Sequence, residues 1–444
     1  MGRAHENERA KAYTYKAVAA EEALKAVKSG DTVVFHASAN EPKALVDALV
    51  GRAPELRDVT IIHMTSLGEG KYTLPEFEKN FRHNGLFISA PTRAAVNGGR
   101  ADYTPTSYSE VPKLFEEGII PINIFLMQVP PPDKHGYCSF GLTVDYAKAA
   151  AKAADIVIAQ INRCMPHTGG EKIHVDTFNY IVEKDEPISE LTPPNVGDVE
   201  REIAKNVASL IPDGATLQLG IGAIPDTVLS FLDDKKDLGI HSEMFSDGVV
   251  DLAEAGVITN KKKAIRQGKF VATFLMGTQK LYSFVDHNPE VEMLSVDFVN
   301  DPYIIGRNEN LISINSALQV DLTGQVNAET LGTKHFTGIG GQLDFVRGAN
   351  RSKGGKSIIA LPSTAAGGKM SRICNDFGPG AAVTTPRGDV QYIVTEYGIA
   401  NLKGKCLSQR IHELINIAHP KFQKELLAEA KKLGRFLERH EFGM

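Results

Sequence analysis

The feature that most constrains the fold of this chain is an internal repeat. One copy spans residues 20–50, AEEALKAVKSGDTVVFHASANEPKALVDALV, and the other spans residues 199–232, VEREIAKNVASLIPDGATLQLGIGAIPDTVLSFL. Each pattern predicts a helix, a short strand, a loop of small residues and a second helix with a proline near its start. Gly30 and Gly214 lie where the first helices should end. A repeated helix–strand–helix unit favours two copies of one α/β architecture.

Two weaker similarities extend the repeat. Residues 58–70 parallel residues 238–248, and residues 154–162 parallel residues 389–397. Strand-like apolar runs alternate with helical runs throughout, and this alternation is typical of mostly parallel sheets.

The length of the chain fits this duplication. A chain of 444 residues is long enough for two to three domains. The segment 188–197, ISELTPPNVG, is rich in proline and has no periodicity, so it is a good boundary. We therefore predict an α/β fold with two similar open domains, 1–192 and 193–444.

Composition argues against several classes of function. A net charge of −5 does not favour nucleic-acid binding, and we predict no such partner. We also predict no membrane span, because no apolar run approaches the roughly 18 residues required. The polar N-terminal residues lack a signal-peptide core, so a cytoplasmic location is expected. The histidines show no metal-ligand spacing, and no metal is predicted. Four widely separated cysteines are expected to be reduced structural thiols: Cys138, Cys164, Cys374 and Cys406.

The first glycine-rich loop follows a predicted strand and begins a predicted helix. Backbone N–H groups at such a position can bind an anion or a pyrophosphate, although a tight structural turn explains the pattern equally well. The loop lacks the third glycine and the acidic residue of a dinucleotide site, and it has no Walker lysine, so an NAD-dependent enzyme is disfavoured. Its candidate ligand-binding residues are Gly220, Ile221, Gly222, Ala223 and Ile224.

A second glycine-rich loop lies at residues 337–347, TGIGGQLDFVR. Glycines free its backbone to direct amides into a binding site, and a packed turn between strands is the alternative. Asp344 and Arg347 could pair with each other and hold the loop. The candidate binding residues are Gly338, Gly340 and Gly341.

Two glutamates are candidate nucleophiles. Glu243, in LGIHSEMFSDG, and Glu396, in VTEYGIANLKGK, each follow an apolar run, where the strands of an open α/β sheet present reactive groups. For both, the alternative is a salt-bridged or helix-capping carboxylate. Asn300, in DFVNDP, is either part of a turn or a donor to a developing oxyanion.

These motifs become specific when they are taken together and in order. LQLGIGAIPD, HSEMFSDGVVDL, INSALQVDLTGQVN, GIGGQLDFVRGA and VTEYGIANLKGK follow HASANEPKALVDAL, SLGEGKY and PPPDKHGYCSFG. The chain closely resembles the acetyl-CoA hydrolase/transferase branch of the family I CoA-transferases. Within that branch, it is most similar to the 4-hydroxybutyrate and butyryl-CoA:acetate CoA-transferases.

The resemblance implies roles for individual residues. The family has two similar α/β domains with the active site at the domain interface. Its nucleophilic glutamate matches Glu243, in an S/T-E-x-x-x-D-G pattern, and not Glu396. Its oxyanion hole matches Asn300 and the backbone amide of Gly341. Both glycine-rich loops are expected to contact coenzyme A.

The resemblance also implies an activity. The expected reaction moves CoA between a short-chain acyl-CoA and acetate, with CoA held covalently on Glu243 as a thioester during turnover. Acyl-CoA and carboxylate are then the partners, no cofactor is tightly bound, and a homodimer is expected. Hydrolysis of acyl-CoA by the same glutamate is the main alternative. A non-catalytic CoA or nucleotide sensor that uses only the glycine loops is the other.

Overall fold

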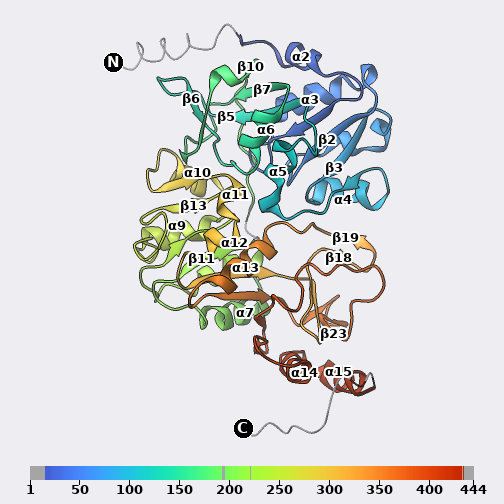
Figure 1. Cartoon of the computed structure of the whole chain (residues 1–444), viewed down its shortest axis with the longest axis vertical. Coiled ribbons are helices and arrows are strands. Elements are labelled where there is room, and N and C mark those ends of the chain that lie inside the picture. Colours follow the sequence, from blue (N-terminus) through green and yellow to red (C-terminus); the bar gives the residue numbers. More distant parts are fainter. Residues whose placement is uncertain (1–15, 193–195, 221, 433, 435–444) are drawn as a thin grey trace. The chain divides into compact units, whose positions relative to one another are not determined.

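The computed structural model describes residues 16–192, 196–220, 222–432 and 434 (Figure 1). The chain divides into two compact α/β units. Unit 1 contains residues up to 192 and two later segments, 242–250 and 269–300. Unit 2 contains residues 193–241, 251–268 and 301–444.

Unit 1 is built on a seven-stranded parallel sheet with the order β10-β7-β5-β1-β2-β3-β4. All six residues of β5 are buried, as expected for a parallel strand that is covered on both faces. The strands are β1 (Thr32–Phe35), β2 (Val59–His63), β3 (Phe81–Gly85), β4 (Asp102–Tyr103), β5 (Ile124–Val129), β7 (Ile156–Ile161) and β10 (Tyr180–Glu183).

Helices cover this sheet and bury the apolar faces that the sequence predicts. The first of them is shorter than its pattern suggests, because α2 gives way to a 3-10 turn at Leu24–Ala26. Leu24 and Val27 are nevertheless fully buried, in one cluster with α3 and the strands. The helices of unit 1 are α2 (Ala20–Ala23), α3 (Lys43–Gly51), α4 (Ala90–Asn97), α5 (Val111–Glu116), α6 (Ala147–Ala153), α10 (Gln279–Val285) and α11 (Val296–Val299).

A small parallel sheet ties segment 269–300 to unit 1. β13 (Phe270–Ala272) pairs with β14 (Val291–Met293), and β14 pairs with β8 (Gly169–Gly170). A Cβ atom at Gly170 would lie 2.1 Å from the carbonyl oxygen of Met293, so only glycine allows this approach. The sequence-based division after residue 192 does not anticipate this pairing. A short hairpin of β6 (Tyr137–Ser139) and β9 (Lys172–His174) completes the unit.

Unit 2 contains a six-stranded sheet with the order β12-β11-β15-β20-β24-β25, in which only β24 and β25 are antiparallel. Its strands are β11 (Thr216–Leu219), β12 (Gly239–Ile240), β15 (Leu311–Ser316), β20 (Lys356–Ala360), β24 (Tyr392–Thr395) and β25 (Gly398–Asn401).

The two sheets share one parallel strand order, as the repeat predicts. The order β2-β1-β5-β7-β10 in unit 1 corresponds to β12-β11-β15-β20-β24 in unit 2. The predicted match of 58–70 with 238–248 therefore agrees with the topology. The match of 154–162 with 389–397 was wrong, because β7 corresponds to β20. Buried parallel strands are similar apolar runs, so their sequences alone do not distinguish one from the next.

The remaining elements of unit 2 surround its sheet. One helix of unit 2 begins at Pro420, because proline suits the first turn of a helix. The helices include α7 (Asp198–Ala208), α8 (Ala223–Leu229), α12 (Pro302–Ile305), α13 (Gln342–Arg351), α14 (Leu407–Asn416) and α15 (Pro420–Lys432). The short strands are β16 (Gln319–Asp321), β17 (Val326–Asn327), β18 (Thr330–Leu331), β19 (Lys334–His335), β21 (Thr364–Ala365), β22 (Met370–Ser371) and β23 (Ile373–Cys374).

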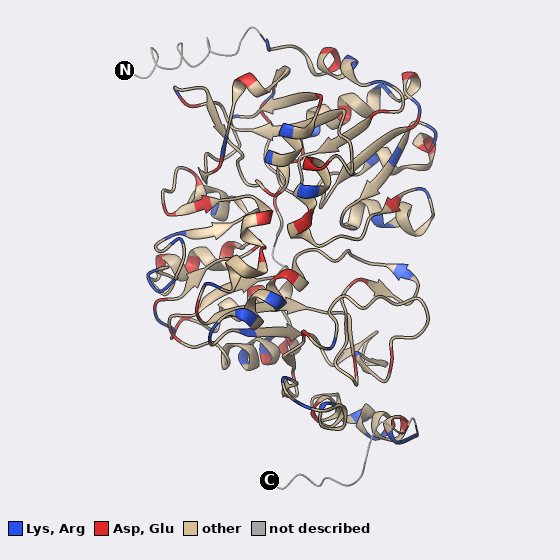
Figure 2. Cartoon of the chain, in the orientation of Figure 1, with Lys and Arg blue, Asp and Glu red and all other residues tan. Residues whose placement is uncertain are grey.

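Two surface properties bear on the predicted partners. Acidic and basic residues are interspersed along both units (Figure 2). Within the described ranges, no helix combines the length and apolar character that crossing a bilayer requires.

Three buried histidines make the stability of unit 1 sensitive to acid. Burial lowers the pKa of His36 and of His63 to about 4, and it lowers the pKa of His83 well below the usual value. His36 Nε2 donates to the Thr143 carbonyl at 2.7 Å. The unfolded chain binds protons on these histidines below about pH 6.5, whereas the folded chain does not, so their contribution to stability is lost as the pH falls towards 4.

Replacing His36 by glutamine should therefore flatten the pH dependence of stability. The glutamine amide can still donate to Thr143 but does not titrate. Between about pH 6 and 4.5, the free energy of unfolding should change less steeply with pH, by up to about 1.4 kcal/mol per pH unit. Urea unfolding across this range measures the slope. Asp145 and Glu41, whose pKa values are raised by burial, act in the opposite sense in both proteins and cancel in the comparison.

The exposed His135 provides the matched control for this experiment. His135→Gln makes the same substitution at an exposed position and should keep the wild-type slope. Equal slopes for His36→Gln and the wild type would contradict the prediction.

Candidate active site

The segment that carries Glu243 is held against β13 by backbone hydrogen bonds. The Ser242 amide donates to the Val271 carbonyl at 3.1 Å, and the Thr273 and Phe274 amides both donate to the Glu243 carbonyl at 3.1 Å. The side chains of the next two residues, Met244 and Phe245, are buried. The backbone at Glu243 is therefore fixed on both sides, and the glutamate side chain is left half-buried.

Asn300 brings its amide to the carboxylate of Glu243. The side chain of Asn300 is fully buried, and Nδ2 donates to Glu243 Oε2 at 2.8 Å. Asn300 is the C-terminal cap of α11, and its backbone amide donates to the Val296 carbonyl at 2.9 Å. Because a carboxamide nitrogen carries two hydrogens, it can hold Glu243 with one and donate to a substrate oxygen with the other. The structure thus joins two residues that are far apart in sequence, both in unit 1.

Asp247, the aspartate of the S-E-x-x-x-D-G pattern, stabilises the turn after Glu243. It is the first residue of α9 (Asp247–Glu254). Its carboxylate accepts hydrogen bonds from the amide and hydroxyl of Thr278 and from the amide of Leu281, at 3.0 to 3.2 Å. These contacts provide hydrogen-bond acceptors for N–H groups at the start of α10 that have no partner within the helix. The sequence assigns this aspartate only to a turn, and its contacts with α10 come from the structure.

Tyr108 and Asp145 are two further residues near Glu243, and the sequence assigns neither an individual role. Tyr108 Oη donates to Asp145 Oδ2 at 3.2 Å, and both side chains are buried. Burial, followed by the negative charges of Asp145 and Glu243, raises the pKa of Tyr108 well above its usual value, so its hydroxyl stays protonated. Neither residue lies in a recognisable motif, so no sequence signal marked them.

The first glycine loop lies in unit 2, at the C-terminal end of β11. The Gly220 amide donates to the Ile314 carbonyl of the neighbouring β15 at 2.8 Å. Gly222 has φ 123°, a conformation that requires glycine, and it precedes Ala223 and Ile224 in the first turn of α8. Ile221 lies outside the described residues. The loop therefore has the strand–loop–helix geometry that suits an anionic ligand.

The second glycine loop ends beside the same strand. Gly341 is the N-terminal cap of α13, and Gly340 has φ 58°. Gln342 Nε2 donates to the Ser316 carbonyl, at the last residue of β15, at 2.8 Å. Both glycine loops thus lie at the C-terminal ends of adjacent parallel strands, in unit 2. Arg347 does not hold the loop through Asp344 as expected, because its guanidinium binds Asp389 at 3.3 Å.

Glu396, the alternative nucleophile, is held by a serine. It follows β24 in unit 2, and its two oxygens accept from the Ser363 amide at 2.8 Å and from the Ser363 hydroxyl at 2.5 Å. The negative charge of Glu396 also acts on Arg372, whose pKa is lowered by burial. The two hydrogen bonds hold this carboxylate in place, which favours a structural role.

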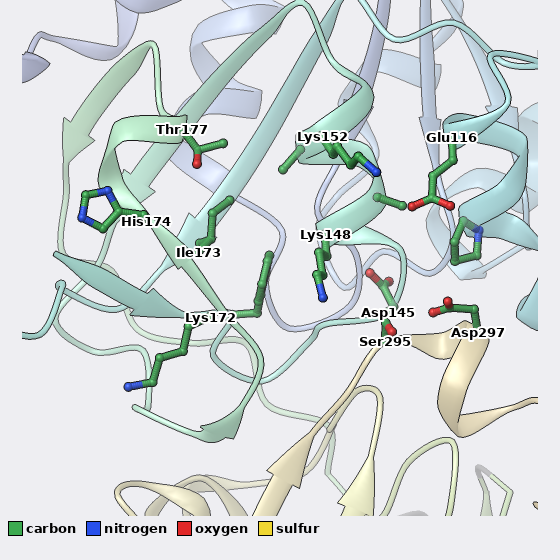
Figure 3. Close-up of a pocket in the computed structure, with 14 residues that line it drawn as sticks. Glu116, Asp145, Lys148, Lys152, Lys172, Ile173, His174, Thr177, Ser295 and Asp297 are labelled. Atoms are coloured by element: carbon green, nitrogen blue, oxygen red, sulfur yellow. The ribbon is translucent and has the colours of Figure 1, made fainter. Parts of the chain in front are cut away.

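A cavity of about 560 Å³ lies elsewhere in unit 1 (Figure 3). It mixes both signs of charge, with Lys148 and Lys152 on α6 and Glu116 on α5. Lys148 forms an ion pair with Glu171 at 2.7 Å. Neither Glu243 nor Asn300 is among the described residues that line it, whereas Asp145 is.

Comparison with known proteins assigns the family. The acetyl-CoA hydrolase/transferase N-terminal domain matches residues 1–193, and the C-terminal domain of the same family matches residues 277–430. The 4-hydroxybutyrate coenzyme A transferase of Clostridium kluyveri is 56% identical over 95% of this chain and 98% of that protein. The butyryl-CoA:acetate CoA-transferase of Anaerostipes caccae is 41% identical over 95% and 97%, respectively.

Solved structures agree with this assignment. The crystal structure of RipA from Yersinia pestis is 40% identical and covers 96% of this chain and 99% of its own, with a TM-score of 0.91. The sequence similarity spans both halves of the chain, and the fold similarity spans nearly all of it. The chain is therefore an enzyme that belongs to the acetyl-CoA hydrolase/transferase family.

Proposed function

We propose that this enzyme transfers CoA between a short-chain acyl-CoA, butyryl-CoA or 4-hydroxybutyryl-CoA, and acetate, with Glu243 as the nucleophile. The observation that carries the proposal is the 2.8 Å hydrogen bond from Asn300 Nδ2 to Glu243 Oε2. It places a buried amide donor beside the carboxylate that the family motif identifies. The relatives named as 4-hydroxybutyrate and butyryl-CoA:acetate transferases support the choice of substrates.

The reaction proceeds through covalent intermediates in which every bond change is balanced. A Glu243 oxygen attacks the thioester carbonyl, the C–S bond breaks, and an acyl-glutamyl anhydride and CoA thiolate form. The thiolate then attacks the glutamyl carbonyl and releases the first carboxylate, leaving a glutamyl-CoA thioester. The second carboxylate reverses these steps. Such a sequence is ping-pong catalysis, and no net proton is transferred.

The difficult step is the first attack. Carboxylate leaves a tetrahedral intermediate more readily than thiolate does, so the adduct tends to return to reactants. Stabilising the oxyanion of that intermediate lowers the barrier in both directions. Asn300 is the donor beside Glu243, and we propose the amide of Gly341 as the second donor. The binding energy of the CoA nucleotide and pantetheine can also be used at the reacting centre.

We propose that the two glycine loops of unit 2 bind CoA. Gly220, Gly222, Gly338 and Gly340 leave the backbone open for close approach, and the loops precede α8 and α13, whose N-terminal amides favour anionic groups. The proposed mechanism uses no tightly bound cofactor. A cytoplasmic homodimer remains our prediction for its location and assembly.

Transferase and hydrolase activity differ in what happens without an acceptor acid. With butyryl-CoA alone, a transferase stops at the glutamyl-CoA thioester, and free thiol should appear at less than about one-hundredth of the transfer rate, because water is a poor acceptor in a closed site. Adding acetate should produce acetyl-CoA. Thiol release that is equally fast with and without acetate would instead identify a hydrolase. A thiol-reactive dye and chromatography of acyl-CoA species measure both quantities.

A further inference from the structure

Asp145 is a buried carboxylate two residues before α6 in unit 1. It has no exposed surface, and its φ of 31° is unusual for a residue other than glycine. Its Oδ1 accepts from the Ala147 amide at 3.0 Å, and its Oδ2 accepts from the Tyr108 hydroxyl at 3.2 Å. A residue with a strained backbone conformation persists only where its surroundings hold it firmly, and such residues cluster at functional sites.

The backbone of Asp145 is linked by hydrogen bonds to the backbone of both proposed catalytic residues. Its amide donates to the Thr273 carbonyl at 3.3 Å, and the Thr273 amide donates to the Glu243 carbonyl. Its carbonyl accepts from the Val296 amide at 3.0 Å, at the start of α11, and Asn300 caps the other end of that helix. Two backbone hydrogen bonds therefore connect Asp145 to Glu243, through Thr273, and two connect it to Asn300, through Val296.

The side chain of Asp145 reaches the same region through Tyr108. The Tyr108 ring packs against Phe274, with 6.1 Å between ring centroids, and the Phe274 amide donates to the Glu243 carbonyl. Both Asp145 and Glu243 act electrostatically on the Tyr108 hydroxyl. Tyr108 thus lies between a fixed carboxylate and the nucleophile.

The other side of Asp145 borders the cavity of unit 1 (Figure 3). Ser295, which precedes α11, lines that cavity as well. Asp145 is itself fully buried, and its hydrogen bonds to Tyr108 and Ala147 fix the position of its carboxyl group. Loss of the bond to Tyr108 would leave the tyrosine hydroxyl without its carboxylate partner and loosen the packing of the ring against Phe274.

We propose that Asp145 is a positioning residue that, through Tyr108 and α11, holds Glu243 and Asn300 in the geometry of attack. This inference rests on the proposed function, because it assigns Glu243 the nucleophilic role. It predicts that weakening the Asp145–Tyr108 contact slows formation of the glutamyl-CoA thioester and leaves substrate binding intact, since small displacements of reacting groups act on the chemical step.

Tyr108→Phe and Asp145→Leu test this prediction in the full-length enzyme. Each should lower kcat about tenfold, with KM for butyryl-CoA and for acetate within about twofold of wild type. Thioester formation on Glu243 in a single turnover should slow by the same factor. Asp145→Asn keeps the shape and a polar contact to Tyr108, so it should restore more than half of the lost rate. The double variant Tyr108→Phe/Asp145→Leu should be no slower than the slower single variant, because both remove one interaction.

Tyr146→Phe is the matched control. The Tyr146 hydroxyl is equally buried and donates to the Phe35 carbonyl at 2.6 Å. This variant should lose stability without losing kcat. Effects carried by KM, additive losses in the double variant, or an equal loss in Tyr146→Phe would overturn the inference. If the wild type forms no adduct on Glu243, the proposed function fails; if it forms the adduct and Tyr108→Phe is fully active, only the positioning role fails.

Discussion

Glu243→Gln is expected to reduce CoA transfer by at least roughly 10⁴-fold, because it removes the nucleophile on which both covalent half-reactions depend. Glutamine has the shape of glutamate, and its carbonyl oxygen can still accept the hydrogen bond that Asn300 makes to Glu243. The fold and the substrate site should therefore be preserved. Wild-type enzyme incubated with butyryl-CoA should carry one CoA, which mass spectrometry of peptides assigns to Glu243. Borohydride should reduce this thioester, and the variant should carry none.

Glu254→Gln is the matched control for this substitution. Glu254 is an exposed carboxylate near the end of α9, the helix that follows Glu243 in sequence. Its variant should transfer CoA and form the adduct at wild-type rates. An adduct on Glu396, or normal transfer by Glu243→Gln, would contradict the assignment of the nucleophile. Intact thermal unfolding of Glu243→Gln separates a chemical loss from a folding defect.

The sequence predicts the architecture of each unit well, because the repeat is carried by local signals. Gly30 and Gly214 lie in equivalent turns before β1 and β11, not at the ends of helices as predicted, and the apolar strand runs follow in the same order in both halves. Both sheets have the same parallel core order. No local sequence signal shows that segments 242–250 and 269–300 belong to unit 1. The pairing of β14 with β8 depends on two glycines, Gly169 and Gly170, that have no periodicity to read.

Some features of the candidate site could likewise be predicted from the sequence, and others could not. Family motifs identify Glu243 and Asn300, and the structure brings them within hydrogen-bonding distance. The motifs do not reveal that Ser363 binds Glu396, because the serine comes from a different strand end. Asp145 and Tyr108 were also unpredictable, since a buried carboxylate and its phenol partner are 37 residues apart in sequence and join no repeated pattern. The roles of Gly341 and of the CoA-binding loops stay predictions.

Asn300→Ala should lower kcat by roughly 10² to 10³-fold, the range expected for loss of one preorganised oxyanion donor. The side chain is fully buried and donates to Glu243, so the variant loses the donor and the hydrogen bond that it makes to the nucleophile. Asn300→Asp should be at least as slow, because an acidic group replaces the donor and repels Glu243. KM for butyryl-CoA should change only a few-fold, since the oxyanion forms in the transition state and not in the bound substrate.

Asn80→Ala separates this catalytic loss from a general loss of stability. Asn80 is a buried asparagine in the same unit, and its amide donates to the carbonyls of Ala53 and Leu56 at 2.7 and 2.9 Å. Its variant should unfold more readily and keep its kcat per folded enzyme. A tetrahedral oxyanion forms in both half-reactions. Asn300→Ala should therefore slow formation of the adduct and its discharge to acetate by similar factors. A loss confined to one half-reaction, or carried by KM, would show that Asn300 only orients Glu243 or the substrate.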